Sequence, residues 1–65
     1  MGRRKKEPRS VHRENIASAA SSLFMEKGIR LVSMDDIAKA AGYSKATLYV
    51  YFENKEEIVS YIVLN

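Results

Sequence analysis

The stretch from residue 34 to residue 52 constrains the fold of this chain more than any other. Residues 34–41 place apolar side chains at helical spacing, and Gly42 follows them, where glycine accepts the left-handed conformation that often ends a helix. Ser44 is suited to begin the next helix, because its hydroxyl can accept a hydrogen bond from an amide of the first turn. Two helices joined by residues 42–44 form a helix-turn-helix pattern, whose second helix can enter the major groove of DNA.

The second of these helices, predicted over residues 45–51, is short enough to point into a groove. It rises by roughly 10 Å at about 1.5 Å per residue, and a major groove is about 12 Å wide. Leu48 and Phe52 are four residues apart and share one side, which predicts a core contact. The opposite side is small, hydroxylated and apolar, which suits thymine methyl groups and base edges, with tyrosines at its borders to reach phosphates. Its members are Ala46, Thr47 and Val50, bordered by Tyr49 and Tyr51. Packing of Val50 and the tyrosines against other protein is the alternative interpretation.

Positive charge is concentrated at the start of the chain. The formal net charge is +3, with a basic excess up to Asn15 and a small acidic excess from Ile16 onward. Residues 1–9 have no apolar side chain after Met1, and we expect them to form a flexible arm. Such an arm is attracted to any polyanion, so that DNA, RNA and an anionic membrane surface all stay open, as does a solvated tail. Its candidate DNA contacts are Arg3, Arg4, Lys5 and Lys6.

The composition argues against several classes of function. A chain of 65 residues is one small domain at most, and without cysteine it has neither disulfides nor thiolate metal sites. His12 is the single histidine, so we expect no metal site, and no cofactor is predicted. No set of serine, histidine and acid is placed to converge, and no glycine-rich phosphate loop occurs, which argues against an enzyme. No apolar run is long enough to span a membrane, and we expect a soluble cytoplasmic protein.

Helical spacing predicts one helix before the helix-turn-helix. Ser10 is a candidate N-cap, and Gly28 is expected to stop the helix after about Lys27. A stripe of apolar residues predicts its core side, namely Ile16, Ala19, Ala20, Leu23 and Phe24. The connection that follows is expected to place its apolar members under the helices, namely Ile29, Leu31 and Val32.

Two further helix starts follow from the spacing of caps. Ser33 with Asp36 matches a capping box, and the helix it begins has a core stripe of Met34, Ile37, Ala38 and Ala41. Asn54 with Glu57 repeats the arrangement and starts a fourth helix at Lys55. Lys55, beside the first amides of that helix, predicts a phosphate clamp. A solvated lysine that offsets Glu56 is the alternative.

The fourth helix is apolar on nearly every side, which is typical of a buried helix. The chain is too short to cover it. We therefore expect Asn65 to be a boundary, with the natural protein continuing into a second domain that covers this helix.

Three blocks of sequence resemble the N-terminal DNA-binding domain of TetR-family (tetracycline-repressor-like) transcriptional regulators. They are Ala19-Ala20-x-x-Leu23-Phe24-x-x-x-Gly28, then Ser33-Met34-Asp35-Asp36-Ile37-Ala38-x-x-Ala41-Gly42, and Ser44-Lys45-Ala46-Thr47-Leu48-Tyr49-x-Tyr51-Phe52-x-Asn54-Lys55-Glu56. The resemblance covers about residues 13–58, and the last two blocks in this order are highly specific.

The resemblance implies an all-α fold, a three-helix bundle with a helix-turn-helix and the start of a fourth helix. Residues 1–9 would be the basic arm, residues 10–54 the DNA-binding domain, and residues 55–65 the start of the helix that leads to a C-terminal domain. That domain would form a homodimer and bind a small-molecule effector that releases the DNA operator, as in a repressor. The positions that match the family's DNA contacts are Ser33, Ser44, Lys45, Ala46, Thr47, Tyr49, Tyr51, Asn54 and Lys55. Tyr51 stands where histidine is frequent in the family.

Two other functions compete with sequence-specific DNA binding. One is a protein-interaction module that docks through the apolar fourth helix. The other is peripheral attachment to a membrane through the basic arm and that helix. Titration against duplex DNA and against anionic vesicles separates these functions.

Overall fold

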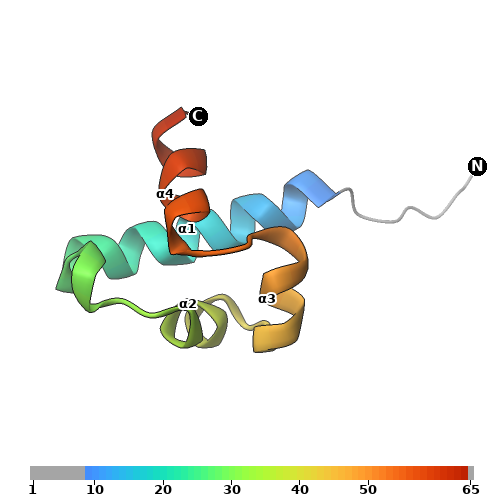
Figure 1. Ribbon diagram of the computed structural model, residues 1–65, viewed down its shortest axis with the longest axis horizontal. Helices are drawn as coiled ribbons and strands as arrows, with labels where there is room; N and C mark the ends of the chain where they lie inside the picture. Colours follow the sequence, from blue (N-terminus) through green and yellow to red (C-terminus); the bar gives the residue numbers. More distant parts are fainter. Residues whose placement is uncertain (1–8, 65) are drawn as a thin grey trace, which may run out of the picture.

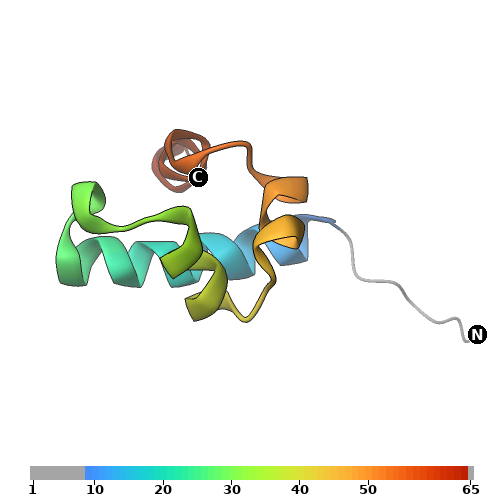
Figure 2. The ribbon, with the colours of Figure 1, turned by 60° about the horizontal axis from the view of Figure 1, so that its bottom comes forward.

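A computed structural model describes residues 9–64 of the chain, and all regular structure in that range is helical. The elements are α1 (Arg9–Lys27), the 3₁₀ turn η1 (Ile29–Leu31), α2 (Met34–Ala41), α3 (Lys45–Tyr51) and α4 (Lys55–Leu64). The long helix α1 runs across the molecule, with α2 and α3 below it in the view of Figure 1 and α4 crossing it toward the top. Figure 2 looks nearly along α4 and shows that it crosses α1 instead of running beside it. The predicted all-α fold with a helix-turn-helix is confirmed.

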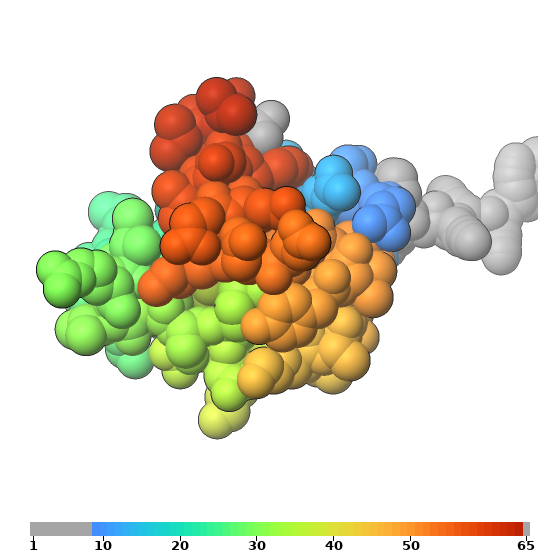
Figure 3. Space-filling view, viewed as in Figure 1, coloured from blue at the N-terminus to red at the C-terminus, as the bar shows by residue number. Residues whose placement is uncertain are grey.

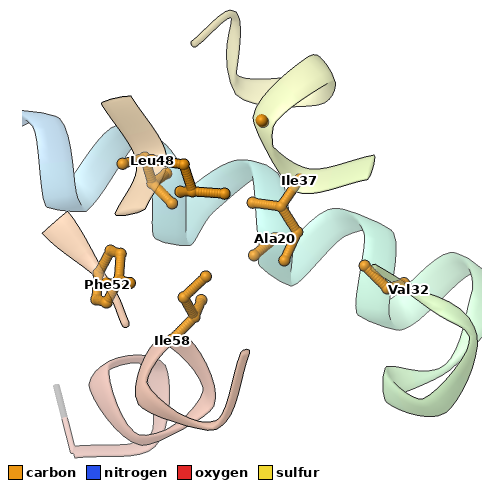
Figure 4. Packing of buried hydrophobic residues seen from close by; sticks show 8 residues of the cluster. Ala20, Val32, Ile37, Leu48, Phe52 and Ile58 are labelled. Atoms are coloured by element: carbon orange, nitrogen blue, oxygen red, sulfur yellow. The ribbon is translucent and has the colours of Figure 1, made fainter. Parts of the chain in front are cut away.

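A single apolar core joins the four α-helices (Figure 4). Ala20 comes from α1, Ile37 from α2, Leu48 from α3 and Ile58 from α4, and each of these side chains is fully buried. Phe52 lies beside them, so that the predicted pair Leu48 and Phe52 is buried as expected. The predicted stripe of α1 is buried at Ile16 and Ala20 but only half-buried at its other positions, which are Ala19, Leu23 and Phe24.

The ends of α2 follow the local rules that predicted them. The Ser33 hydroxyl accepts a hydrogen bond from the Asp36 amide at 3.1 Å, and the Asp36 carboxylate accepts one from the Ser33 amide at 3.0 Å. Gly42 ends the helix in the left-handed conformation, with φ 81° and ψ 27°. The capping box and the glycine stop are both confirmed, and together they fix where the turn to α3 begins.

Two predictions for the start of the chain and its first connection are wrong. Ser10 lies inside α1 and is not its N-cap, because the helix extends back to Arg9, where this side chain reaches α3. Ile29 and Leu31 are 45% and 74% exposed, and only Val32 is buried. The cause is the tight 3₁₀ turn, which directs its own side chains outward and returns the chain to the core at the extended residue Val32.

The start of α4 differs from the predicted capping box in one bond. Asn54 Oδ1 accepts from the Glu57 amide at 2.9 Å, as expected, but the Glu57 carboxylate accepts from the amide of Glu53 instead of that of Asn54. Further along α4, Tyr61 donates to the Glu14 carboxylate of α1 at 3.2 Å. Partial burial, followed by the negative charge of Glu14, raises the pKa of the Tyr61 phenol. Within residues 9–64, no helix is both long enough and apolar enough to cross a membrane.

Candidate nucleic-acid interface

The outward side of α3 is exposed where the sequence predicted a DNA-reading surface. Ala46 and Thr47 are exposed, and Val50 and Tyr49 are 58% and 45% exposed, while Leu48 between them is fully buried. In Figure 3, α3 forms a projecting corner of the molecule, away from the end of α4. The buried Leu48 therefore anchors a short helix whose exposed side chains are available to a partner. We call Ala46, Thr47, Tyr49 and Val50 the outer surface of α3.

The hydroxyls at the start of α3 are oriented by each other. Ser44 Oγ accepts from the Thr47 amide at 3.1 Å and donates to Thr47 Oγ1 at 2.9 Å. The predicted N-cap is therefore confirmed, and the capping hydroxyl is committed to the helix. Thr47 Oγ1 acts as acceptor in this pair, which leaves its own hydrogen to be donated outward. The pair favours one rotamer of the Thr47 side chain.

Lys45 is held near the start of α2. Its ammonium lies 3.4 Å from the Asp35 carboxylate, and both side chains are more than half exposed. An exposed ion pair of this kind contributes little to stability, typically about 0.5 kcal/mol. The pair lies where the first turns of α2 and α3 meet. Lys45 thus lies beside Asp35, and Ser33 is two residues away along the chain.

Tyr51 lies in an aromatic cluster and not on the outer surface of α3. Its ring is half-buried, with the His12 ring centroid 5.5 Å away and that of Tyr43 6.5 Å away. His12 Nδ1 and the Tyr43 hydroxyl are 2.8 Å apart, and the Asn15 amide donates to the same hydroxyl at 3.4 Å. The ring of Tyr51 is therefore part of the contact between α1 and α3.

Lys55 bonds to the connection between α1 and α2. Its ammonium donates to the carbonyl oxygens of Ile29 at 2.7 Å and Val32 at 2.9 Å. Two of its three N–H donors are used in this way, so one is left for a phosphate. The side chain of the neighbouring residue Asn54 is exposed and caps α4.

The predicted contacts thus fall into one group and one exception. Lys55 bonds to Val32, the residue before Ser33, and Asp35 of the same helix start pairs with Lys45. These bonds link the start of α2 to the start of α4 and to the start of α3. Tyr51 is the exception, because it packs toward α1. The predicted arm contacts Arg3, Arg4, Lys5 and Lys6 lie outside the described residues.

The electrostatics at the start of α2 also follow from the cap. The two hydrogen bonds with Ser33, first the backbone bond and then the side-chain bond, lower the pKa of the Asp36 carboxyl from its ordinary value of 3.8. Asp36 therefore stays ionised at neutral pH and is bound to its own helix end. Its charge offsets the positive end of the helix dipole instead of facing a ligand.

Sequence reasoning missed three residues that position α3: Arg9, His12 and Tyr43. The Arg9 guanidinium donates to the Val50 carbonyl at 3.2 Å and lies 4.9 Å from the centre of the Tyr51 ring. A sequence signal did exist for His12, since it stands four residues before the buried Ile16 and so continues the core stripe of α1.

Comparison with known proteins agrees with this geometry. Residues 16–62 match the model of a family described as bacterial regulatory proteins, tetR family. The chain is 44% identical over 46 residues to the negative transcriptional regulator IcaR of the biofilm operon icaADBC in Staphylococcus epidermidis, covering 71% of this chain and 25% of that protein. It is 34% identical over 62 residues to the transcriptional regulator AcrR of Shigella flexneri, covering 95% and 29%. It is 41% identical over 51 residues to the transcriptional activator FasR of Mycolicibacterium smegmatis, covering 78% and 23%. The chain thus spans about a quarter of the length of these relatives.

Proposed function

The chain belongs to the tetR family of bacterial regulatory proteins and carries the DNA-binding region of a transcriptional regulator, and from this premise we propose that α3 reads the base sequence of duplex DNA. The observation that carries the proposal is the outer surface of α3, exposed on a helix whose position is fixed by the buried Leu48. Small and methyl-bearing side chains there fit thymine methyl groups, and Thr47 adds a hydroxyl donor for a base edge.

The other contacts divide by chemistry. Lys45 and Thr47 are proposed to read bases, because an ammonium and a hydroxyl can both bond to base edges. Ser33, Ser44, Tyr49, Tyr51, Asn54 and Lys55 are proposed to lie along phosphates, which set the register of the helix without selecting a sequence. Ala46 supplies van der Waals contact at the groove.

The proposed regulation goes beyond the described residues. We propose that the whole protein acts in the cytoplasm as a homodimer that represses transcription, and that a small effector bound by a C-terminal domain releases the operator. The name of the relative IcaR as a negative regulator supports repression, whereas that of FasR as an activator favours the opposite sign. Transcription from an operator-bearing template, with and without the protein, decides between them.

Selection of bound duplexes from a random pool tests the base contacts. Lys45→Ala and Thr47→Ala are each expected to change the selected base at one or two positions, with a loss of about 1–3 kcal/mol of discrimination there. Tyr49→Ala is expected to weaken binding to all duplexes to a similar degree. Arg30→Ala is the matched control, since it removes an exposed charge on η1.

The same experiment can reject the proposal. If Lys45→Ala and Thr47→Ala both left the selected sequences unchanged, the assignment of α3 as the reading helix would be wrong. Titration against anionic vesicles tests peripheral attachment to a membrane, which tight vesicle binding without DNA binding would favour. Binding to neither DNA nor vesicles would favour a protein-interaction module.

A further inference from the structure

We propose that Arg9 is a positioning residue for α3, which holds the end of this helix through Val50 and Tyr51 instead of neutralising a DNA phosphate. The proposal deepens the function proposed above and rests on it for the consequence in DNA binding. The part of the proposal that concerns the position of α3 can be measured on the protein without DNA.

The contact of Arg9 is with the carboxyl end of α3. Arg9 Nη2 donates to the Val50 carbonyl oxygen at 3.2 Å, and the helix ends one residue later at Tyr51. The last carbonyls of a helix lack partners within it, and the end of the helix carries a partial negative charge. A guanidinium there supplies both a donor and a favourable charge. It does so across 41 residues of sequence, from the first residue of α1.

The same guanidinium also packs on an aromatic ring. Its central carbon lies 4.9 Å from the centre of the Tyr51 ring, within the range of a cation–π contact. The Tyr51 ring in turn contacts His12, one turn further along α1. Arg9 and His12, both on α1, therefore contact the Tyr51 ring. Through this ring, α1 fixes the position of the end of α3.

The shortness of α3 makes this support necessary. Leu48 is the one buried residue within the seven of α3, with Phe52 directly after the helix. Tyr51 is the second side chain of α3 that packs on the core, and it is only half-buried. Without its contacts the helix can tilt about Leu48, and the exposed Tyr49 and Val50 then move relative to a groove. The contacts of Arg9 with Val50 and Tyr51 oppose that tilt at the end of the helix.

A competing role for Arg9 is direct contact with a phosphate, because its side chain is exposed and a guanidinium has five N–H donors. The two roles differ in a measurable quantity. The plot of log K against log salt concentration has a negative slope. Removal of a phosphate contact makes that slope shallower by about 0.9. Removal of a positioning contact lowers affinity with the slope unchanged.

The test compares Arg9→Ala with Arg30→Ala, which removes the same charge from an exposed position on η1. The first measurement is amide hydrogen exchange of the protein alone. The Phe52 amide, which donates to the Leu48 carbonyl at 3.0 Å, reports on the end of α3. We expect it to exchange about fivefold faster in Arg9→Ala than in the control, as for the loss of one modest hydrogen bond. The second measurement is binding of a selected duplex over a range of salt, with about fivefold weaker binding and an unchanged slope expected.

A second pair of variants separates the ring of Tyr51 from its hydroxyl. Tyr51→Phe keeps the ring beside Arg9 and is expected to keep the slow exchange of the Phe52 amide. Tyr51→Leu removes the ring and is expected to speed that exchange as Arg9→Ala does.

Three results would overturn the proposal. The first is exchange in Arg9→Ala equal to that in Arg30→Ala, and the second is a salt slope lower by about 0.9. The third is equal exchange in Tyr51→Phe and Tyr51→Leu. Failure of the unmodified chain to select any duplex would instead contradict the proposed function, and the exchange measurements would still decide the role of Arg9.

Discussion

Two glycines hold backbone conformations with positive φ, but they differ in what they tolerate. Gly42 lies in the left-handed helical region, with φ 81° and ψ 27°. Gly28 has φ 91° and ψ 146°, an extended region with positive φ that is almost closed to other residues. A Cβ added at either position meets no atom within 4 Å. The cost of a substitution is therefore set by the backbone and not by crowding.

This difference predicts an order of stability. Gly42→Ala is expected to lower the free energy of unfolding by about 1 kcal/mol, the cost of a left-handed alanine. Gly28→Ala is expected to cost more, about 2–3 kcal/mol, because its conformation is more strained. Urea denaturation measures both, and Gly42→Asn serves as the control because asparagine tolerates the left-handed region better. An equal or reversed order would contradict the backbone argument.

Ser33 and Asp36 give a prediction about pH. Two hydrogen bonds from Ser33 lower the pKa of the Asp36 carboxyl, so this group stabilises the fold above its ordinary pKa of 3.8 and loses that effect as pH falls through the lowered value. In Ser33→Ala the side-chain bond is lost, and the pKa of Asp36 is expected to rise. Titration of the Asp36 side chain by NMR measures the change, and Ser18→Ala, at an exposed position of α1, is the control. The Ser33 amide still donates to the Asp36 carboxylate in Ser33→Ala, so an unchanged pKa would mean that the Ser33 hydroxyl has no effect on this carboxyl in solution.

At the scale of the helices, contacts between near neighbours in sequence were predictable and distant ones were not. The caps at Ser33 and Ser44 each bond to a residue three positions later, and the rules for helix ends describe such bonds directly. The burial of Leu48 followed from helical spacing in the same way. The side of α3 that forms the candidate site was therefore predictable from the sequence.

The contacts that orient the helices relative to each other could not be predicted. Lys55 and Ile29 are 26 residues apart, and Arg9 and Val50 are 41 apart. Their pairing depends on how α1, η1 and α4 pack, and no local pattern encodes it. The prediction that Ile29 and Leu31 lie in the core is wrong for the same reason, and both are exposed. The 3₁₀ turn that contains them is set by the space between two packed helices, which no local pattern encodes.

The two hydrogen bonds of the Lys55 ammonium predict that this residue stabilises the fold even when no DNA is bound. Lys55→Met keeps the apolar stem but removes the ammonium from the Ile29 and Val32 carbonyls, and is expected to cost about 1–3 kcal/mol. Urea denaturation measures it, with Lys39→Met on the exposed side of α2 as the control. If the two variants were equally stable, the ammonium would contribute only through DNA.

At the scale of the whole molecule, the net positive charge and the outer surface of α3 belong to different parts of the chain. Residues 9–64 carry as many acidic as basic side chains, and the formal net charge of +3 therefore belongs to residues 1–8. The helical part presents its outer surface of α3 with little net attraction for a polyanion. On the proposed function, we therefore expect long-range attraction to DNA to come mainly from the basic residues that precede α1, and selection at short range to come from α3.

This separation predicts that affinity and selectivity can be changed independently. Replacement of the four basic residues Arg3, Arg4, Lys5 and Lys6 by glutamine is expected to lower the salt slope of binding by up to about 3.6, at about 0.9 for each phosphate contact. The sequence selected from a random pool is expected to stay the same, because the side chains of α3 are untouched. Glutamine at Lys27 and Arg30, two exposed basic residues at the far end of α1 and on η1, is the control for general charge effects. An unchanged slope would show that the first eight residues do not contact phosphates, and a changed selection would show that they read bases as well.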